Sequence, residues 1–317
     1  MLRAVSFHLP VPASEPVDLF PSLRGLVADG ERGDWAAVVA HVGGLGSLDD
    51  VVVAFSQVEE RLSDHVLARV PVGDPSWGLA QTTRAARITA EGWKIRGDGW
   101  ARTVTQPQWV AFREHLNRAE QLLIEVTARE PRLGYAWLER MTTCQGLSLG
   151  ADEARRRYDR LSAHAPHTYI AGFRLMQQLL PKWSGSWEQV SAFAAELLRV
   201  TPPGSVGLLP VLAGHLERHS AAQTDAEAAA YLRDPAVVAE IHLVADRTVR
   251  HPAFQPGYRL YTAHDYFAML FSLMGDHAAA APHFRALRGR RTPFWEWYFD
   301  DAGTAYARHR DRALARG

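Results

Sequence analysis

The sequence predicts an all-α protein in which helical hairpins stack into one α–α superhelix, a single solenoid-like array. Three observations support this prediction. Apolar residues recur at helical spacing through most of the chain, prolines close the expected helix pairs at a regular interval, and no long alternation of polar and apolar residues indicates a strand. The chain of 317 residues also exceeds the usual size of one hydrophobic core, which favours an elongated array or two domains.

The N-terminal part begins with an expected extended arm, residues 1–33, which carries several prolines. The first helix is expected over 35–42, where Asp34 is suited to cap the first turn and the glycine-rich stretch 43–46 ends the helix. Ser47 is expected to begin the next helical segment, whose apolar residues between Val51 and Leu62 share one face.

A regular period marks the middle of the chain, where the repeat array is expected over 34–203. Helices are predicted over 78–95, 109–128, 135–146, 152–164, 170–180 and 187–200. Pro131, Pro166 and Pro202 close successive units and are 35 and 36 residues apart. Helical-hairpin repeats of the tetratricopeptide class recur at about 34 residues, and each hairpin needs a neighbour to bury its apolar face.

The C-terminal region, residues 204–317, departs from this period and is expected to continue or cap the array. Helices are predicted over 234–250 and 258–274, and a helical segment follows over 275–287. Pro282 predicts a kink or a late helix start there, because proline lacks the N–H that a helix interior uses. Residues 219–227 are polar and rich in alanine, which indicates an exposed loop.

Two motifs stand out in the middle of the chain, RGDGWARTV over 96–104 and LLPKWSGSW over 179–187. They resemble signatures of an uncharacterised bacterial family of Sel1-like and tetratricopeptide-like helical-repeat proteins. The resemblance extends over residues 78–203 and implies an α-helical solenoid, but it implies no activity. Ser184 stands where glycine is common in that family.

The second motif also has a direct physical interpretation as a turn between helices. Pro181 ends the preceding helix, Gly185 permits an unusual backbone conformation, and Ser184 or Ser186 can cap the next helix. Trp183 and Trp187 are then available to pack between hairpins, or alternatively to contact a ligand or partner.

Near the first motif, a polar patch can form inside the curved array, from Arg96 with Trp93, Lys94, Asp98, Arg84 and Arg87. Arg96 is therefore a candidate binding residue for an anion. Arginine–aspartate pairs that hold repeats together are, however, commoner than anion sites.

Composition limits the classes of partner. The 35 basic and 35 acidic residues leave no net charge, which gives no reason to expect nucleic acid or an anionic membrane as partner. Lys94 and Lys182 are the only lysines, a bias typical of GC-rich bacterial coding rather than of phosphate binding. The single cysteine, Cys144, excludes an internal disulfide and a multi-cysteine zinc site. No signal peptide and no apolar run of about 20 residues is recognisable, so a cytoplasmic location is expected.

Of all segments in the sequence, 261–267 most resembles a catalytic site. Tyr261, His264 and Asp265 lie on about one side of the predicted helix, and a histidine near a carboxylate and phenols can act as a general acid or base. Adjacent helical residues point about 100° apart, however, so His264 and Asp265 need not interact. Hydrogen bonding between helices is the alternative and commoner role.

The segment 292–301 is the densest in aromatic residues, with Trp295 and Trp297 as candidate binding residues and Asp301 at its end. It can cap the array, form an interface with a partner, or line a small-molecule pocket. His215 and His219 have the spacing of zinc ligands, but a third ligand is missing from this pattern, so no metal is predicted.

Together these features favour a non-catalytic helical-repeat protein that binds a partner protein or peptide through its concave face, without a cofactor. The alternative is an enzyme or small-molecule-binding protein of bacterial specialised metabolism, with a pocket formed by the C-terminal helices. A third interpretation is a structural subunit that needs a partner for stability. If His264 and Asp265 line one enclosed pocket, the alternative gains; if they lie in separate packing contacts, partner binding is favoured.

Overall fold

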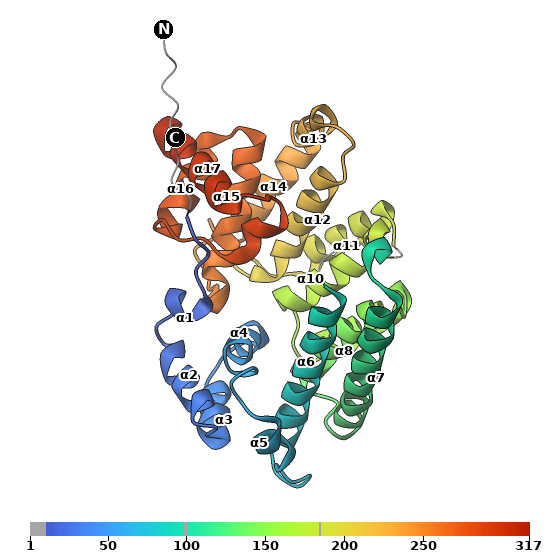
Figure 1. Cartoon of the computed structure of the whole chain (residues 1–317). Coiled ribbons are helices and arrows are strands. Elements are labelled where there is room, and N and C mark those ends of the chain that lie inside the picture. The colour runs from blue at the N-terminus through green and yellow to red at the C-terminus, as the bar shows by residue number, and fades with distance from the viewer. Residues whose placement is uncertain (1–10, 98–100, 184) are drawn as a thin grey trace. The chain divides into compact units, whose positions relative to one another are not determined.

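The computed structural model describes residues 11–97, 101–183 and 185–317 and shows an all-helical chain (Figure 1). No β-strand forms in these three ranges, where β-type pairing is limited to an isolated bridge between Ala13 and Arg291. Contacts divide the chain into two compact units. One is Phe20–Phe193, and the other joins Met1–Leu19 to Ala194–Gly317.

The unit Phe20–Phe193 is a succession of helices joined by short turns. Its elements are α2 Leu23–Glu31, α3 Trp35–Gly43, α4 Leu48–Val58, α5 Asp64–Ala68, α6 Trp77–Arg96, a 3-10 turn Ala101–Thr103, α7 Gln106–Arg129, α8 Gly134–Gly146, α9 Ala151–Ser162, α10 Tyr169–Gln178, a 3-10 turn Pro181–Trp183, and the first half of α11 Trp187–Val200.

The expected extended arm over residues 1–33 is wrong for its second half, where α1 (Pro16–Leu19) and α2 form. Leu23 and Leu26 of α2 are fully buried, so the gain from burying this helical stripe decides the conformation. The prolines do not prevent it, because Pro16 is the first residue of α1 and Pro21 precedes α2.

Several helix starts follow the predicted caps. The side chain of Asp34 accepts a hydrogen bond from the Ala37 N–H at 3.0 Å at the start of α3. Ser47 accepts one from the Asp50 N–H at 3.1 Å at the start of α4. These caps satisfy donors that the first turn of a helix leaves free, which explains why the sequence could locate both starts.

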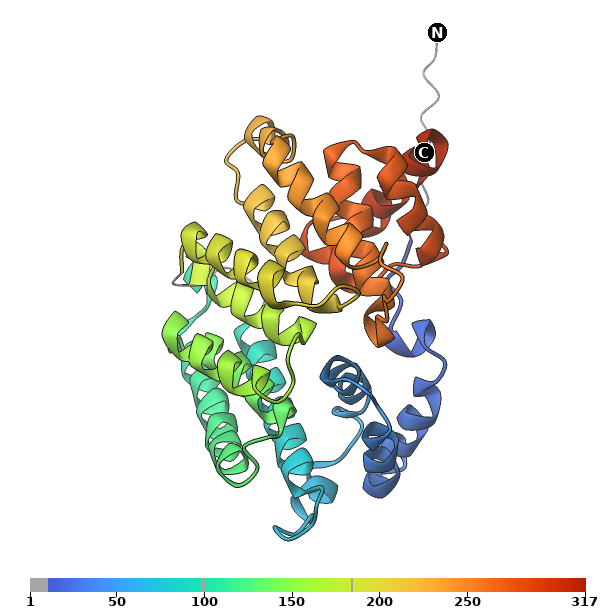
Figure 2. The same cartoon turned by 180° about the vertical axis from the view of Figure 1, so that it is seen from behind.

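Helices α6 to α10 pack in chain order, so each contacts the helix that follows it. In addition, α8 contacts both α6 and α10. Figures 1 and 2 show α6 and α7 side by side in both views. The apolar stripes of α6, α7 and α8 form a shared core, and its fully or nearly fully buried residues are Trp77, Ala85, Ile88, Ala119, Leu123, Val126 and Ala136.

The turn between α10 and α11 has the predicted form in its described residues. A Cβ atom on Gly185 would lie 2.0 Å from the carbonyl oxygen of Leu179, so only glycine fits this close approach. The Ser186 hydroxyl accepts a hydrogen bond from the Gln189 N–H at 3.3 Å and caps α11. The alternative cap, Ser184, lies outside the described residues.

A buried ion network ties α7, α8 and α9 together. The Glu120 carboxylate of α7 accepts hydrogen bonds from Arg140 of α8 at 2.7 Å and from Arg157 of α9 at 2.9 Å. Arg157 also donates to Glu153 at 2.6 Å, and its side chain is only 3% exposed. Two guanidinium groups therefore face two carboxylates inside the unit, and their charges balance.

The unit of Met1–Leu19 and Ala194–Gly317 contains the C-terminal helices. Its elements are α1, the second half of α11, α12 Leu209–Ser220, α13 Asp225–Tyr231, α14 Pro235–Arg247, α15 Leu260–Met274, α16 His277–Leu287 and α17 Ala302–Arg316, with 3-10 turns at Val206–Leu208, Gly257–Arg259 and Pro293–Trp297. In this unit α15 packs against α12, α16 and α17.

Two local predictions in this unit need correction. The loop expected over residues 219–227 is limited to the turn between α12 and α13, because Thr224 caps α13 through the Glu227 N–H at 3.2 Å. The late helix start expected from Pro282 is wrong, because α16 begins at His277 with Asp276 as its cap. Pro282 lies inside α16, where it removes one backbone donor.

Candidate functional site

His264 and Asp265, the strongest catalytic candidates of the sequence, lie in separate packing contacts. Asp265 of α15 is fully buried and accepts hydrogen bonds from the Thr292 N–H at 2.9 Å, the Thr292 hydroxyl at 2.7 Å and the Trp295 indole N–H at 2.8 Å. Burial raises the pKa of Asp265 to about 7 even though these three donors favour the ionised form. Its carboxyl group thus fixes the 292–295 segment to α15.

His264 faces another histidine instead. Its Nδ1 atom lies 3.0 Å from Nδ1 of His283 on α16, so one ring must donate and the other accept in this contact. Phe267 and Phe271 stack on the His283 ring with centroid distances of 5.1 and 5.7 Å. Burial lowers the pKa of His264 to about 4 and, with help from His264 and Arg250, that of His283 to about 3.

This histidine pair predicts an acid-sensitive stability. Both folded-state pKa values lie below the ordinary value of 6.5, so the unfolded chain binds more protons at mildly acidic pH. The contribution of the pair to the free energy of unfolding should therefore fall as the pH drops below 6.5, by about 2 kcal/mol for each histidine between roughly pH 7 and pH 5. Carboxyl groups with a raised pKa, such as Asp265, act in the opposite direction, so the effect of the pair is the difference between the wild type and a histidine variant. Urea unfolding at pH 7 and at pH 5 measures this loss of unfolding free energy.

The comparison that tests this uses two variants. His283→Gln should lose at least one histidine's share of the pH dependence, whereas His65→Gln, at an exposed position of α5, should behave like wild type. An unchanged pH dependence in His283→Gln would contradict the assignment.

The other C-terminal candidates are dispersed. Trp295 is fully buried and bonded to Asp265, whereas Trp297 is 61% exposed. Tyr261 is half-buried in the first turn of α15. The Asp301 side chain caps α17 by accepting a hydrogen bond from the Thr304 N–H at 3.1 Å. These side chains do not form one catalytic group.

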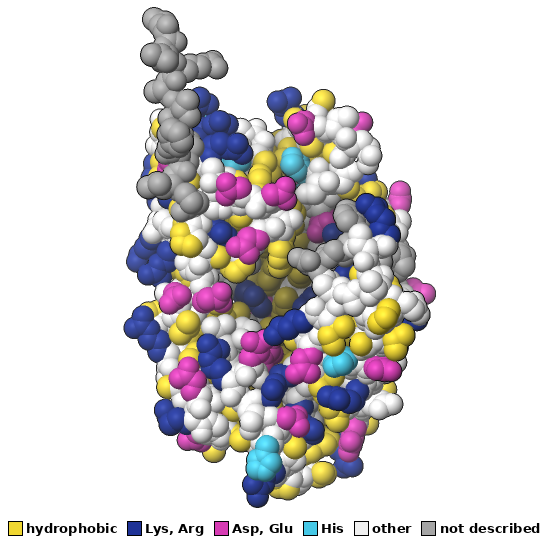
Figure 3. Space-filling view, viewed as in Figure 1, with side chains coloured by type: hydrophobic (Ala, Val, Ile, Leu, Met, Phe, Trp, Pro, Cys, Tyr) yellow, Lys and Arg dark blue, Asp and Glu magenta, His cyan; other side chains and the backbone are white. Residues whose placement is uncertain are grey.

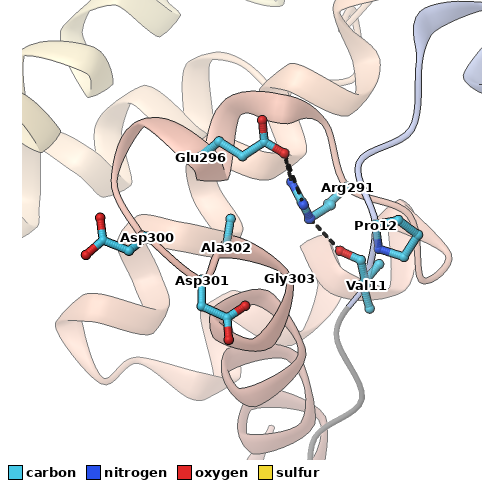
Figure 4. Close-up of a pocket in the computed structure, with 8 residues that line it drawn as sticks. All are labelled: Val11, Pro12, Arg291, Glu296, Asp300, Asp301, Ala302 and Gly303. Carbon is cyan, nitrogen blue, oxygen red and sulfur yellow. Dashed lines mark hydrogen bonds and ion pairs between the residues drawn. The ribbon is translucent and has the colours of Figure 1, made fainter. Parts of the chain in front are cut away.

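Asp301 also lines a surface cavity of about 410 Å³ beside the N-terminal arm, with Arg291, Glu296 and Val11 among its other walls (Figure 4). Arg291 donates to the Val11 carbonyl oxygen at 2.6 Å and to Glu296 at 3.1 Å. The Ser14 N–H donates in turn to the Arg291 carbonyl oxygen at 2.8 Å. The buried guanidinium group therefore holds the arm in place.

A second group of candidates comes together in the unit Phe20–Phe193. We call it the tryptophan–arginine cluster and define it by five half-buried or exposed residues from α6, α7 and the 3-10 turn before α11. These are Trp93, Arg96, Trp109, Arg113 and Trp183. Arg96 and Trp183 were both candidates from the sequence, and the structure brings their two motifs into one place.

The contacts of the cluster form a continuous series. Trp183 meets Trp93 edge to face with ring centroids 6.5 Å apart. The guanidinium carbon of Arg96 lies over the Trp93 ring at 5.5 Å and over the Trp109 ring at 5.4 Å. Arg113 lies over the Trp109 ring at 6.0 Å. Each such contact attracts the cation to the negative face of the indole ring.

Local structure positions these side chains. Trp93 and Arg96 are three residues apart on α6, and Trp109 and Arg113 are four apart on α7, so each pair shares a helix face. The Gln108 amide donates to the Ile95 carbonyl oxygen at 2.9 Å and joins the start of α7 to the end of α6.

Two further contacts anchor the aromatic rings of the cluster. The Gln178 amide donates to the Trp183 carbonyl oxygen at 2.6 Å and so fixes the turn that carries this ring. Phe112, which is buried, packs edge to face against both Trp93 and Trp109 at centroid distances of 4.8 and 5.8 Å. The cluster is therefore held from the core side.

Two half-buried carboxyl groups were missed by sequence reasoning. Burial raises the pKa of Glu59, at the end of α4, to about 7, and that of Glu139, on α8, to about 7. The charge of Glu59 also raises the pKa of Glu139, while Arg174 lowers it. For Glu139, the signal in the sequence was its place between Leu138 and Arg140, which are both buried. This signal is weak because most helical glutamates are exposed.

The remaining candidates give no joint site. Trp187 is half-buried at the start of α11. His215 lies 2.7 Å from the Tyr231 hydroxyl and 2.9 Å from Glu240, while His219 lines a different cavity. Among the described residues no group of three or more His, Cys, Asp or Glu side chains could hold a metal ion.

Comparisons with protein-family models, with curated proteins and with solved structures give no match for this chain. Within the part of the chain that the structure describes, no helix combines the length and the apolar character that crossing a membrane requires.

Proposed function

We propose that this protein is a non-catalytic helical-repeat protein that binds a partner protein or peptide. The proposal includes a solenoid-like array of hairpins, as the resemblance to Sel1-like and tetratricopeptide-like repeats implies. The consecutive packing of α6 to α10 supports this arrangement, since each helix covers the next.

The observation that carries the proposal is the tryptophan–arginine cluster. Tryptophan and arginine are the residues most enriched at the energetic centres of protein interfaces, where a rim of near-neutral contacts surrounds them. Here three indole rings and two guanidinium groups remain half-buried or exposed, although Phe112 beside them is buried. Val110 extends the apolar surface with 47% of its area exposed.

The enzymatic alternative has weaker support. His264 contacts His283, Asp265 binds Thr292 and Trp295, and Asp301 caps α17, so each group has a structural contact of its own. A general acid–base pair needs both groups within reach of one substrate, and these contacts place them apart.

The test compares partner capture by two tryptophan variants. We expect Trp109→Ala to lose a stoichiometric partner that the wild type retains on co-purification, with a loss of about tenfold or more because hot-spot truncations cost 2 kcal/mol or more. Quantitative mass spectrometry of the eluates measures it, and thermal unfolding confirms that the variant is folded.

The matched control is Trp297→Ala, which removes an exposed indole ring from the other unit and should leave capture unchanged. Loss of the partner in the control alone would place the interface on the aromatic C-terminal segment instead. Retention of a tightly held small molecule, with no partner, would favour the alternative function.

A further inference from the structure

We infer that the tryptophan–arginine cluster binds an acidic segment of its partner, with a partner carboxylate held by the guanidinium group of Arg113, which lies on the Trp109 ring. This inference rests on the proposed function and names the chemistry of the partner. The carrying observation is the contrast between Arg113 and other arginines of the chain that lie over aromatic rings.

Among the described residues, five arginines outside the cluster lie over a ring and also bind a carboxylate. Arg129 lies over Trp77 and pairs with Glu125 at 3.0 Å, and Arg155 lies over Tyr158 and pairs with Asp159 at 2.9 Å. The same double contact occurs for Arg140 with Glu120, Arg250 with Asp246 and Arg310 with Asp311.

Arg113 departs from this pattern. It lies over Trp109, but no carboxylate of the described residues pairs with it. An indole ring attracts a cation without neutralising its charge, so the contact leaves the hydrogen-bond donors of Arg113 available for an anion. A carboxylate is the natural match, because guanidinium groups bind carboxylates through two parallel hydrogen bonds.

Lys94 and the two acidic residues near it lie on another side of α6 from Arg96. Lys94 is two residues before Arg96, which places it about 200° away around α6. It pairs with Glu60 and feels the charge of Glu91, so those two acids lie with Lys94 rather than with the cluster. Both signs of charge are mixed over the face of the molecule that Figure 3 shows.

The partner segment should combine carboxylates with apolar side chains. Trp109, Val110 and Arg113 lie within one turn of α7, and Val110 and Trp109 offer apolar surface beside the guanidinium group. A purely polar acidic chain would leave this surface in water, whereas apolar side chains would cover it.

The experiment uses two fluorescein-labelled peptides of equal length, one of Glu-Leu-Glu-Gly repeats and one of Gln-Leu-Gln-Gly repeats. Fluorescence anisotropy with the full-length protein measures binding. We expect the glutamate peptide to bind and the glutamine peptide to bind at least about fivefold more weakly, with added salt reducing the difference.

Substitutions identify the site. Arg113→Gln should weaken binding of the glutamate peptide about fivefold and Arg113→Glu by more than about tenfold. Arg155→Gln is the matched control, because Arg155 also lies over a ring but already has a carboxylate, and it should bind as wild type does. Equal binding of both peptides, absence of binding, or an unaffected Arg113→Glu would each overturn the inference.

Failure of this inference is separable from failure of the proposed function. If Trp109→Ala loses the co-purified partner while Arg113→Glu retains it, the cluster is an interface and its partner segment is not acidic. If Trp109→Ala also retains the partner, the cluster is not the interface, so this inference fails while partner binding itself stands. If the wild type retains no partner at all, the proposed function fails.

Discussion

Replacing Glu120 by glutamine should lower the free energy of unfolding by about 3–5 kcal/mol, the largest single effect that the structure predicts. Glu120 accepts hydrogen bonds from Arg140 and Arg157, and Arg157 is almost completely buried. Glutamine keeps the shape but removes the charge, so two guanidinium groups would remain with Glu153 as the single carboxylate. Urea unfolding followed by circular dichroism measures the difference from wild type.

Glu125→Gln supplies the control for this prediction, because it lies on the same helix and also pairs with an arginine. The Glu125–Arg129 pair spans 3.0 Å, but about half of each side chain is exposed. Exposed pairs contribute about 0.2–1 kcal/mol, so this change should cost less than about 1 kcal/mol. Similar costs for both variants would show that the Glu120 network does not stabilise the unit.

Replacing Asp265 by alanine should cost about 3–4 kcal/mol of unfolding free energy, because buried donors would lose their acceptor. The carboxyl group receives hydrogen bonds from the Thr292 N–H and hydroxyl and from the Trp295 indole. Near-ultraviolet circular dichroism should also lose signal, because Trp295 packs against Tyr306 at 5.2 Å and depends on this anchor.

Asp300→Ala tests whether any aspartate in this region matters equally. Asp300 is exposed, and its replacement should change stability by no more than about 0.5 kcal/mol. If Asp265→Ala were as mild as the control, Asp265 would not anchor the 292–295 segment, and its availability for chemistry would need to be considered again.

Local signals located most helices before any tertiary information was used. The helices predicted over 78–95, 135–146 and 187–200 are α6, α8 and α11, whose ends agree to within one residue. This success has a physical reason, since apolar spacing and caps act within a few residues of the chain. The caps Asp34, Ser47 and Ser186 act in this way.

Two errors in the helix prediction have different causes. α2 forms in a segment with several prolines because Leu23 and Leu26 are buried against the rest of its unit. α13 forms in a stretch that appears loop-like because Thr224 caps it. Composition alone could not show the first outcome, since it depends on where the segment lies after the other helices have packed. The Thr224 cap is a local signal that the sequence contained.

The sequence by itself determined that the chain is helical, where most of its helices begin, and which side chains could carry chemistry. Only the tertiary structure decided that His264 and Asp265 point into different contacts and that Trp183 meets Trp93. The reason is that helix formation depends on neighbours a few residues away, whereas the meeting of residues about 90 positions apart depends on which faces the helices bury.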